Sequence, residues 1–275
     1  MSQLLAIASA ALFGLADFAG GRASRELSVW RVTAWSTTIG VPLLALGVIV
    51  VPAPNVQPSD IIFGAVAGLV GLIGLALLYS TLAAGAMSIV APIIGTVAAV
   101  LPVMWDVALG ASITPGNWVG VGLGIAAVAL IAGERSGERL TSKLLIQALG
   151  AAVAFAIFYI ALAQTSSDSG LWPLVAARSA AIPLAFGVAL LAGTAAIPPK
   201  GVMRFVIIAG SFDMLANFAI LVSLQTGPMG INVVLTSLYP VFTVAAAILI
   251  LKEHPTVRQS VGIVLAIVAV AFLAL

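Results

Sequence analysis

The sequence predicts an all-α integral membrane protein with ten transmembrane helices, arranged as two inverted repeats of five helices. Three observations lead to this fold class: the composition, the spacing of the apolar segments, and a similarity between the two halves of the chain. Hydrophobic residues make up 62% of the 275 residues and charged residues only 7%, whereas soluble domains average about 45–50% and about 25%. Most of the surface must therefore face a lipid bilayer.

The composition also excludes several classes of function. The chain has 11 Lys and Arg residues against 9 Asp and Glu residues, so it lacks the basic patch that nucleic acid binding needs. It has no cysteine and one histidine, His254, which leaves no Cys- or His-based metal site and no thiol nucleophile. No G-x-x-x-x-G-K-[ST] motif is present, so this chain alone is not expected to drive transport with ATP. We expect no metal, no cofactor and no nucleic acid partner, and nothing in the sequence implies an oligomer.

Ten apolar segments are long enough to cross a bilayer, which takes about 20 residues at about 1.5 Å per residue. Pro, Gly and charged residues separate these segments. We place the spans near 3–21, 28–51, 60–83, 87–109, 116–133, 143–163, 171–193, 203–224, 229–251 and 257–275. The joints between them are short, so no domain is expected between two spans.

The two halves of the chain match each other at a constant offset of 142 residues. The offset pairs Gly, Met and Phe residues as well as Ala and Val, for example Phe13 with Phe155, Gly68 with Gly210 and Met87 with Met229. We therefore expect a first repeat at 1–133, a connecting loop at 134–142 and a second repeat at 143–275. Because each repeat has an odd number of spans, the two must lie in opposite orientations in the bilayer.

Basic residues mark one side of the predicted bundle. All Lys and Arg residues except Arg178 lie at the joints that follow spans 1, 5, 7 and 9, and the joints after spans 2, 4, 6 and 8 have none. The positive-inside rule then predicts that the basic joints face the cytoplasm and that both termini lie outside. We expect this topology in the inner (cell) membrane.

Several motifs resemble those of a known family. They are Gly227-Pro228-Met229, Ser237-Leu238-Tyr239-Pro240 and Glu253 in the second half, with Phe13-Gly14 and Ala83-Ala84-Gly85-Ala86-Met87-Ser88 as weaker counterparts in the first. The pattern resembles the drug/metabolite transporter (DMT) superfamily, and within it the ten-helix EamA type. This resemblance implies export or uptake of small metabolites or drugs through a central cavity. It also implies cytoplasmic termini, the opposite of what the charge pattern predicts.

Four ionisable side chains lie inside the predicted spans: Asp17, Asp106, Arg178 and Asp213. Each such group costs about 2.5–3.5 kcal/mol on insertion scales, which makes it a functional candidate. Asp213 lies about 15 Å into its span, and Asn217 follows one turn later on the same face. We expect both to line a substrate cavity, and the alternative is a purely structural role in the bundle.

Arg178 needs a partner, because a buried arginine is normally paired with a carboxylate. We expect an ion pair with Asp213 or with Asp106. If the partner is Asp213, Arg178 either holds the bundle together or binds a substrate carboxylate that displaces Asp213.

Asp17 and the end of span 4 offer further roles. Asp17 lies toward the basic end of its span, where it either pairs with Arg22 or Arg31 or loads a proton, which would then serve as the coupling ion. Asp106, beside Trp105 near the end of span 4, is expected at a gate.

Aromatic and amide side chains complete the predicted substrate site. The offset places Tyr159 at the position of Asp17, so both are expected on the inner face of their spans. Tyr159 and Tyr239 lie well inside spans, and their rings are suited to stacking on an aromatic or cationic substrate. Tyr79 and Asn232 are the remaining candidates.

Glycines and prolines predict local geometry. The glycines of span 3, which form small-xxx-small patterns that let helices approach closely, are Gly64, Gly68, Gly71 and Gly74. The prolines expected to break helices are Pro92, Pro102, Pro183 and Pro240.

These features predict a secondary transporter that moves a small organic metabolite, amino acid-like or drug-like, by alternating access. An intramembrane enzyme and a structural or channel-like membrane protein are the alternatives, both of which would use the buried carboxylates. The chain is not expected to be an enzyme, because it lacks a nucleophile with a base and lacks a metal site. No repeated filter-like segment favours a channel.

Overall fold

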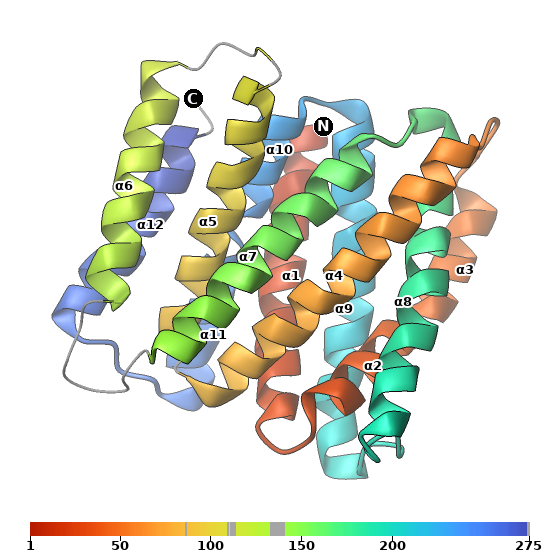
Figure 1. Cartoon of the computed structure of the whole chain (residues 1–275), viewed down its shortest axis with the longest axis horizontal. Coiled ribbons are helices and arrows are strands. Elements are labelled where there is room, and N and C mark those ends of the chain that lie inside the picture. The colour runs from red at the N-terminus through yellow and green to blue at the C-terminus, as the bar shows by residue number, and fades with distance from the viewer. Residues whose placement is uncertain (86, 109, 111–113, 133–140, 274–275) are drawn as a thin grey trace.

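The computed structural model describes residues 1–85, 87–108, 110, 114–132 and 141–273, apart from a few side chains within the helices. Every regular element in these ranges is a helix, which confirms the all-α class (Figure 1). The helices are α1 (Ser2–Ser24), α2 (Val29–Ile39), α3 (Val41–Val50), α4 (Pro58–Ala84), α5 (Met87–Ala108), α6 (Pro115–Ala132), α7 (Ser142–Ala163), α8 (Trp172–Leu191), α9 (Lys200–Thr226), α10 (Met229–Thr236), α11 (Tyr239–Leu251) and α12 (Val257–Leu273). A short 3-10 turn, η1 (Ser167–Ser169), precedes α8.

Eight helical stretches in the described residues are long and apolar enough to cross a membrane. Two of them combine helices, α2 with α3 and α10 with α11. Two shorter apolar stretches, Trp118–Ala127 and Ser260–Phe272, lie in α6 and α12. The chain is thus a multi-pass membrane protein, and a count of ten spans depends on α6 and α12.

Two predicted spans are interrupted near their middle. The second is broken at Gly40, which separates α2 from α3, and the ninth between α10 and α11. In both cases a proline lies in the first turn of the helix that follows the break. Pro42 and Pro240 have no N–H, so they donate no helical hydrogen bond to the backbone oxygens of Thr38 and Thr236, four residues earlier. These two threonines lie in the last turns before the breaks. The break expected at Pro240 is confirmed, whereas the one at Gly40 was not predicted.

The other expected proline breaks are wrong. Helix α5 continues through Pro92 and Pro102, and α8 continues through Pro183. A proline removes one backbone hydrogen bond, and membrane helices tolerate this loss where neighbouring helices pack around it.

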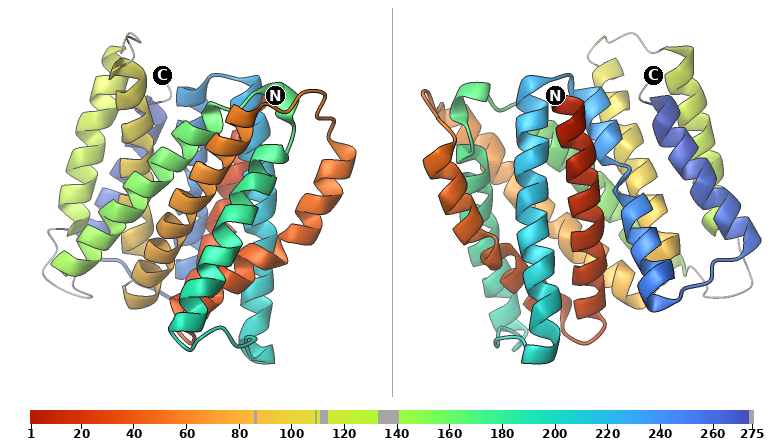
Figure 2. Two further views of the ribbon diagram at one scale, coloured as in Figure 1. Left: turned by 45° about the vertical axis from the view of Figure 1, so that its right-hand side comes forward. Right: turned by 180° about the vertical axis from the view of Figure 1, so that it is seen from behind.

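The helices of the two repeats pack against each other in matching pairs. Helix α1 packs along α9, and its counterpart under the 142-residue offset, α7, packs along α4, the counterpart of α9. Helices α6 and α12, which are also counterparts, pack together. Figure 1 shows α1 and α7 running in opposite directions, and likewise α4 and α9. In both views of Figure 2, α1 begins and α12 ends on the same side of the molecule.

Glycines on α4 allow the close helix contact that the sequence predicted, and the partner helix is α8. A Cβ atom at Gly68 would lie 2.2 Å from the carbonyl oxygen of Ala177, and one at Gly64 would lie 2.4 Å from that of Pro173. Both contacts are with backbone, which cannot rotate away as a side chain does. The other two glycines of the pattern face phenylalanine rings of α7. The α4–α8 contact therefore depends on the absence of side chains on one face of α4.

A partly buried carboxylate joins the repeats on the side of the basic joints. Glu253 accepts hydrogen bonds from the backbone N–H of Met87 (3.2 Å) and of Ser88 (3.0 Å), and from the Ser88 hydroxyl (2.8 Å). It also pairs with Arg25 at 3.1 Å. Because Glu253 belongs to the second repeat and its partners to the first, this cluster ties the two repeats together.

A second carboxylate joins the repeats on the opposite side. Asp60, in the first turn of α4, accepts from the backbone N–H of Gln57 (2.8 Å), from the backbone N–H of Ser166 (2.7 Å) and from the Ser166 hydroxyl (3.1 Å). Gln225 donates to the Ser166 carbonyl oxygen at 3.0 Å. The start of α4 is thereby held against the joint between α7 and α8.

Glu253→Gln is expected to lower the free energy of unfolding by about 1.5–3 kcal/mol, because hydrogen bonds to a charged group contribute about that much. The change in melting temperature in detergent micelles measures it. Glu26→Gln is the control, because Glu26 pairs with Arg22 on the surface with a side chain 45% exposed, and such pairs contribute about 0–1 kcal/mol. Equal stability losses in the two variants would contradict a structural role for Glu253.

Candidate functional site

A pocket lies between helices α1, α2, α4, α7, α8, α9 and α11. It has a volume of about 700 Å³, including space that opens to the surroundings, which is the size range of small-molecule sites. Its lining is mostly apolar. Six of the eight predicted substrate contacts line it: Asp17, Tyr159, Arg178, Asp213, Asn217 and Tyr239.

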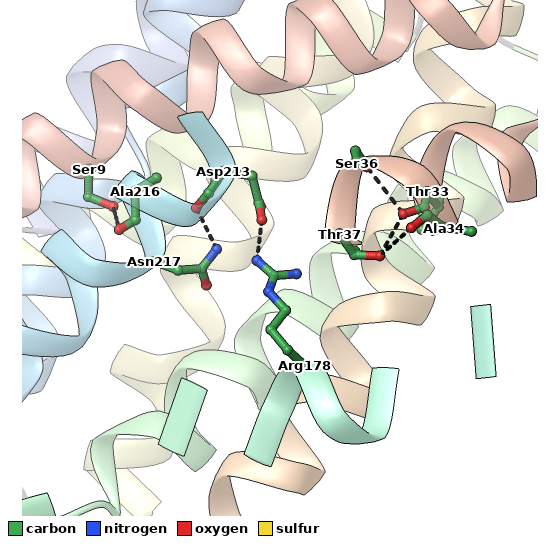
Figure 3. A network of polar contacts seen from close by, with 9 residues as sticks. All are labelled: Ser9, Thr33, Ala34, Ser36, Thr37, Arg178, Asp213, Ala216 and Asn217. Atoms are coloured by element: carbon green, nitrogen blue, oxygen red, sulfur yellow. Dashed lines mark hydrogen bonds and ion pairs between the residues drawn. The ribbon is translucent and has the colours of Figure 1, made fainter. Parts of the chain in front are cut away.

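An ion pair between Arg178 and Asp213 lies in this pocket (Figure 3). Asp213 is the central residue of α9, and Arg178 reaches it from the first half of α8. The two side chains are only 13% and 14% exposed. Of the two partners predicted for Arg178, Asp213 is therefore confirmed, and each charge has its counterpart in an apolar environment where an unpaired one would be costly.

Local hydrogen bonds fix the position of the ion pair. The amide of Asn217 donates to the backbone oxygen of Asp213 at 2.7 Å, one turn back along α9. On the neighbouring residue, the carbonyl oxygen of Ala216 accepts from the hydroxyl of Ser9 at 2.9 Å, which holds α1 against α9 at this level. Figure 3 shows Asn217 and Arg178 on the same side of Asp213. The pocket thus presents a carboxylate, a guanidinium and an amide together.

Asp17 has no such partner. It lines the pocket and is 6% exposed, and no hydrogen bond or ion pair of its carboxylate is found among the described residues. The expected pairing with Arg22 or Arg31 is wrong. Arg22 pairs with Glu26 at 2.5 Å, and Arg31 donates to the backbone oxygen of Thr194 at 2.8 Å. The helical register turns Asp17 inward, away from the basic side chains that follow it.

Two tyrosines complete the polar lining. The ring of Tyr159 contacts that of Phe158 edge to face, with centroids 5.3 Å apart. Tyr239 is the first residue of α11, so the break before this helix sets its position. Its buried hydroxyl has no hydrogen-bond partner in the described part of the chain.

Equivalent positions of the two repeats meet in the pocket. Four pairs related by the 142-residue offset have both members in its lining: Phe13 and Phe155, Asp17 and Tyr159, Gly71 and Asp213, and Leu75 and Asn217. They lie on α1 and α7 and on α4 and α9. The pocket therefore lies between the repeats. In the two pairs that contain a carboxylate, Asp17 and Asp213, the other member is uncharged. The offset could have identified Phe13 and Phe155 as lining residues, which the sequence analysis did not propose.

The remaining candidates lie elsewhere. Tyr79 is fully buried in the contact of α4 with α1, where a Cβ atom at Gly20 would lie 2.1 Å from its ring. Asn232 is buried and donates to the backbone oxygen of Ser223 at 2.8 Å, linking α10 to α9. Neither is part of the pocket lining. Trp105 is 43% exposed near the end of α5.

The side chain of Asp106 lies outside the described residues, so its predicted pairing and gating role have no structural account. Among the residues that the structure does describe, no group of three His, Asp or Glu side chains could hold a metal ion. The side chains that line the pocket can form ion pairs, hydrogen bonds and aromatic contacts.

Comparisons with known proteins agree with this architecture. Residues 1–133 and 142–275 match the EamA-like transporter family. A solved crystal structure is similar with a TM-score of 0.71 at 18% identity, covering 98% of this chain and 95% of the other. At that identity the likeness concerns the fold alone. No curated protein matches the sequence.

Proposed function

Because the chain belongs to the EamA-like transporter family, we propose that it is a secondary carrier that moves a small organic metabolite across the membrane by alternating access. Members of this family are transporters, so the family does not favour the enzyme alternative. The proposed carrier consists of two inverted repeats, 1–133 and 143–275, joined by 134–142. It has ten spans when α6 and α12 are counted.

The observation that carries this proposal is the lining of the pocket by equivalent positions of the two repeats. Carriers built from inverted repeats bind substrate near the midplane at the repeat interface, and they alternate access by moving one part of the bundle against the other. A site that both repeats line in this way can be reached from either side in turn. The central position of Asp213 along α9 supports a site at mid-depth.

By the positive-inside rule, we place the basic joints on the cytoplasmic side of the inner (cell) membrane. The joint between α1 and α2, the first turns of α9 and the joint between α11 and α12 carry Lys or Arg and lie on one side of the molecule (Figure 2). This puts the start of α1 and the end of α12 on the outer side. We retain the end of α5, with Trp105 and Asp106, as the proposed gate.

Efflux from proteoliposomes tests the function. Vesicles are loaded with an equimolar mixture of aromatic amines, amino acids and their deaminated acids, and the released compounds are measured by mass spectrometry. The wild-type protein is expected to release at least one class faster than protein-free vesicles do. A release rate that saturates as the concentration of that compound rises would distinguish a carrier from a channel.

Asn217→Leu is expected to slow the release of that compound about tenfold, because removing a polar contact of about 1.4 kcal/mol changes an equilibrium by that factor. Gln164→Leu is the matched control. The amide of Gln164 also donates to a backbone oxygen four residues earlier, but it is exposed at the end of α7. Wild-type release no faster than that of empty vesicles would contradict the carrier, and equal release by both variants would contradict the site.

A further inference from the structure

The charges of the pocket do not balance. Two carboxylates, Asp17 and Asp213, face one guanidinium, Arg178. Asp213 and Arg178 neutralise each other in their ion pair. When Asp17 is ionised, its negative charge is left without a counterpart in a lining that is otherwise apolar or neutral.

Nothing near Asp17 in the described structure supplies a counterpart. The three arginines that follow it along the chain are engaged elsewhere: Arg22 with Glu26, Arg25 with Glu253, and Arg31 with the backbone of Thr194. The side chain is 6% exposed, so bulk water does not solvate it. A buried carboxylate in this situation is costly unless a positive group or a proton joins it.

The same imbalance argues against an anionic substrate. A substrate carboxylate would have to displace Asp213 from Arg178, which would leave two unpaired carboxylates in the pocket instead of one. A zwitterion would bring one charge of each sign, so the excess negative charge would remain. A monovalent cation removes the excess, and no ion pair of the structure has to break.

The rings beside Asp17 favour an organic cation over an inorganic one. Tyr159 and Tyr239 line the same pocket as Asp17. Phe13 and Phe155 line the same pocket. Aromatic faces attract ammonium groups, by about 0.5–2 kcal/mol per contact, and they bury the apolar body of a ligand. An inorganic cation would instead need several oxygen ligands.

We propose that Asp17 is the counter-ion for a protonated amine, and that the pocket takes small monovalent organic amines with an aromatic or aliphatic body. This inference rests on the carrier proposed above and names its substrate class. Because the equivalent position in the second repeat is Tyr159, the pocket has one such carboxylate and binds one cation at a time.

Binding to the purified full-length protein in lipid nanodiscs tests this assignment by isothermal titration calorimetry. Three probes share one aromatic body and differ in charge: 2-phenylethylamine is a cation, phenylalanine a zwitterion and 3-phenylpropionate an anion. The amine is expected to bind tightest and 3-phenylpropionate weakest. Asp17→Asn is expected to weaken amine binding about 10- to 100-fold, the usual loss when a hydrogen bond to a charged group is removed.

Asp168→Asn is the matched control, because Asp168 lies exposed in η1, outside the pocket, and this variant is expected to bind the amine as the wild type does. Asp17→Asn is expected to fold with a melting temperature at least as high as that of the wild type, since it removes an unpaired buried charge. A lower melting temperature would contradict the absence of a partner for Asp17.

Two results would overturn the substrate class while leaving the carrier intact: phenylalanine or 3-phenylpropionate bound more tightly than the amine, or amine affinity unchanged in Asp17→Asn. Absence of binding of all three probes by a protein that is active in proteoliposomes would also overturn it. Failure of the carrier itself is recognised separately, as the absence of any release from proteoliposomes.

Discussion

Arg178→Met is expected to lower the free energy of unfolding by about 3–5 kcal/mol, the largest loss of any single substitution considered for this chain. Methionine has nearly the length of arginine and fits an apolar pocket, but it leaves Asp213 buried without a positive partner. Removing one partner of a buried ion pair has this cost because the other charge is neither solvated nor compensated. Melting temperature and denaturant unfolding in detergent micelles measure the loss.

Two further variants make the result specific. Arg22→Met removes an arginine from an exposed pair with Glu26, so it is expected to cost about 0–1 kcal/mol. The double variant Arg178→Asp with Asp213→Arg restores a pair of reversed polarity and is expected to recover most of the lost stability. If Arg178→Met is no less stable than Arg22→Met, the ion pair does not stabilise the fold.

The charge reversal also separates the two roles predicted for Arg178. If Arg178 and Asp213 only hold α8 against α9, the double variant transports as the wild type does. If either group also contacts substrate, the double variant is stable and transport is lost. With Asp17 as the counter-ion of the substrate, we expect transport to be reduced less by the reversal than by Asp17→Asn.

Gly68→Ala is expected to destabilise the protein by about 3 kcal/mol, at the upper end of the range for overpacking. The added methyl group would lie 2.2 Å from the carbonyl oxygen of Ala177 and 2.5 Å from its Cα atom. Because both atoms are backbone, α4 and α8 must move apart as rigid bodies to accommodate it. Gly68 also lines the pocket, so the shift changes the site as well as the packing.

Gly122→Ala on α6 is the matched control, since a Cβ atom at Gly122 would meet no atom within 4 Å. Alanine is about 1 kcal/mol more favourable than glycine inside a helix, so this variant is expected to be as stable as the wild type or more so. Equal melting temperatures for both alanine variants would show that α4 and α8 are not in the close contact described.

The sequence predicted a pair of Arg178 with Asp213 or with Asp106, because the charges of these residues and their depth in the spans are enough to suggest it. Arg178 and Asp213 are both far inside apolar segments, where an arginine is costly without a carboxylate. The offset between the repeats also indicated that Asp17 and Tyr159 share a face. Both inferences depend on features that a linear sequence contains: charge, distance from the span ends, and repetition.

Rotation of each helix about its axis was harder to predict. Tyr79 and Tyr239 are both tyrosines within predicted spans, yet Tyr239 lines the pocket and Tyr79 packs against Gly20 on α1. The spans are apolar all round, so no amphipathic pattern shows which face turns inward. The offset between the repeats did indicate the inward direction of Asp17, but the apolar pattern gave no second sign of it, so a pair with Arg22 or Arg31 stayed open as an alternative.

The effects of prolines and joint residues depend on tertiary contacts. Helices α5 and α8 pass through their internal prolines, whereas Pro42 and Pro240 each follow a break. Ser166, which donates to Asp60, and Ser88, which donates to Glu253, are each more than 100 residues away from that carboxylate along the chain. Local sequence specifies neither outcome, because both depend on which helices pack together.

Two-sided accessibility of the pocket tests the central claim most directly, and the absence of native cysteine in the chain makes it measurable without background. Ala181→Cys places a thiol in the pocket lining, and Ala185→Cys places one a turn further along α8, fully buried outside that lining. A membrane-impermeant methanethiosulfonate reagent is applied to right-side-out and to inside-out vesicles. Alternating access predicts that Ala181→Cys is labelled from both sides and Ala185→Cys from neither. Labelling of Ala181→Cys from one side only, or from neither, would contradict a pocket that opens to each side in turn.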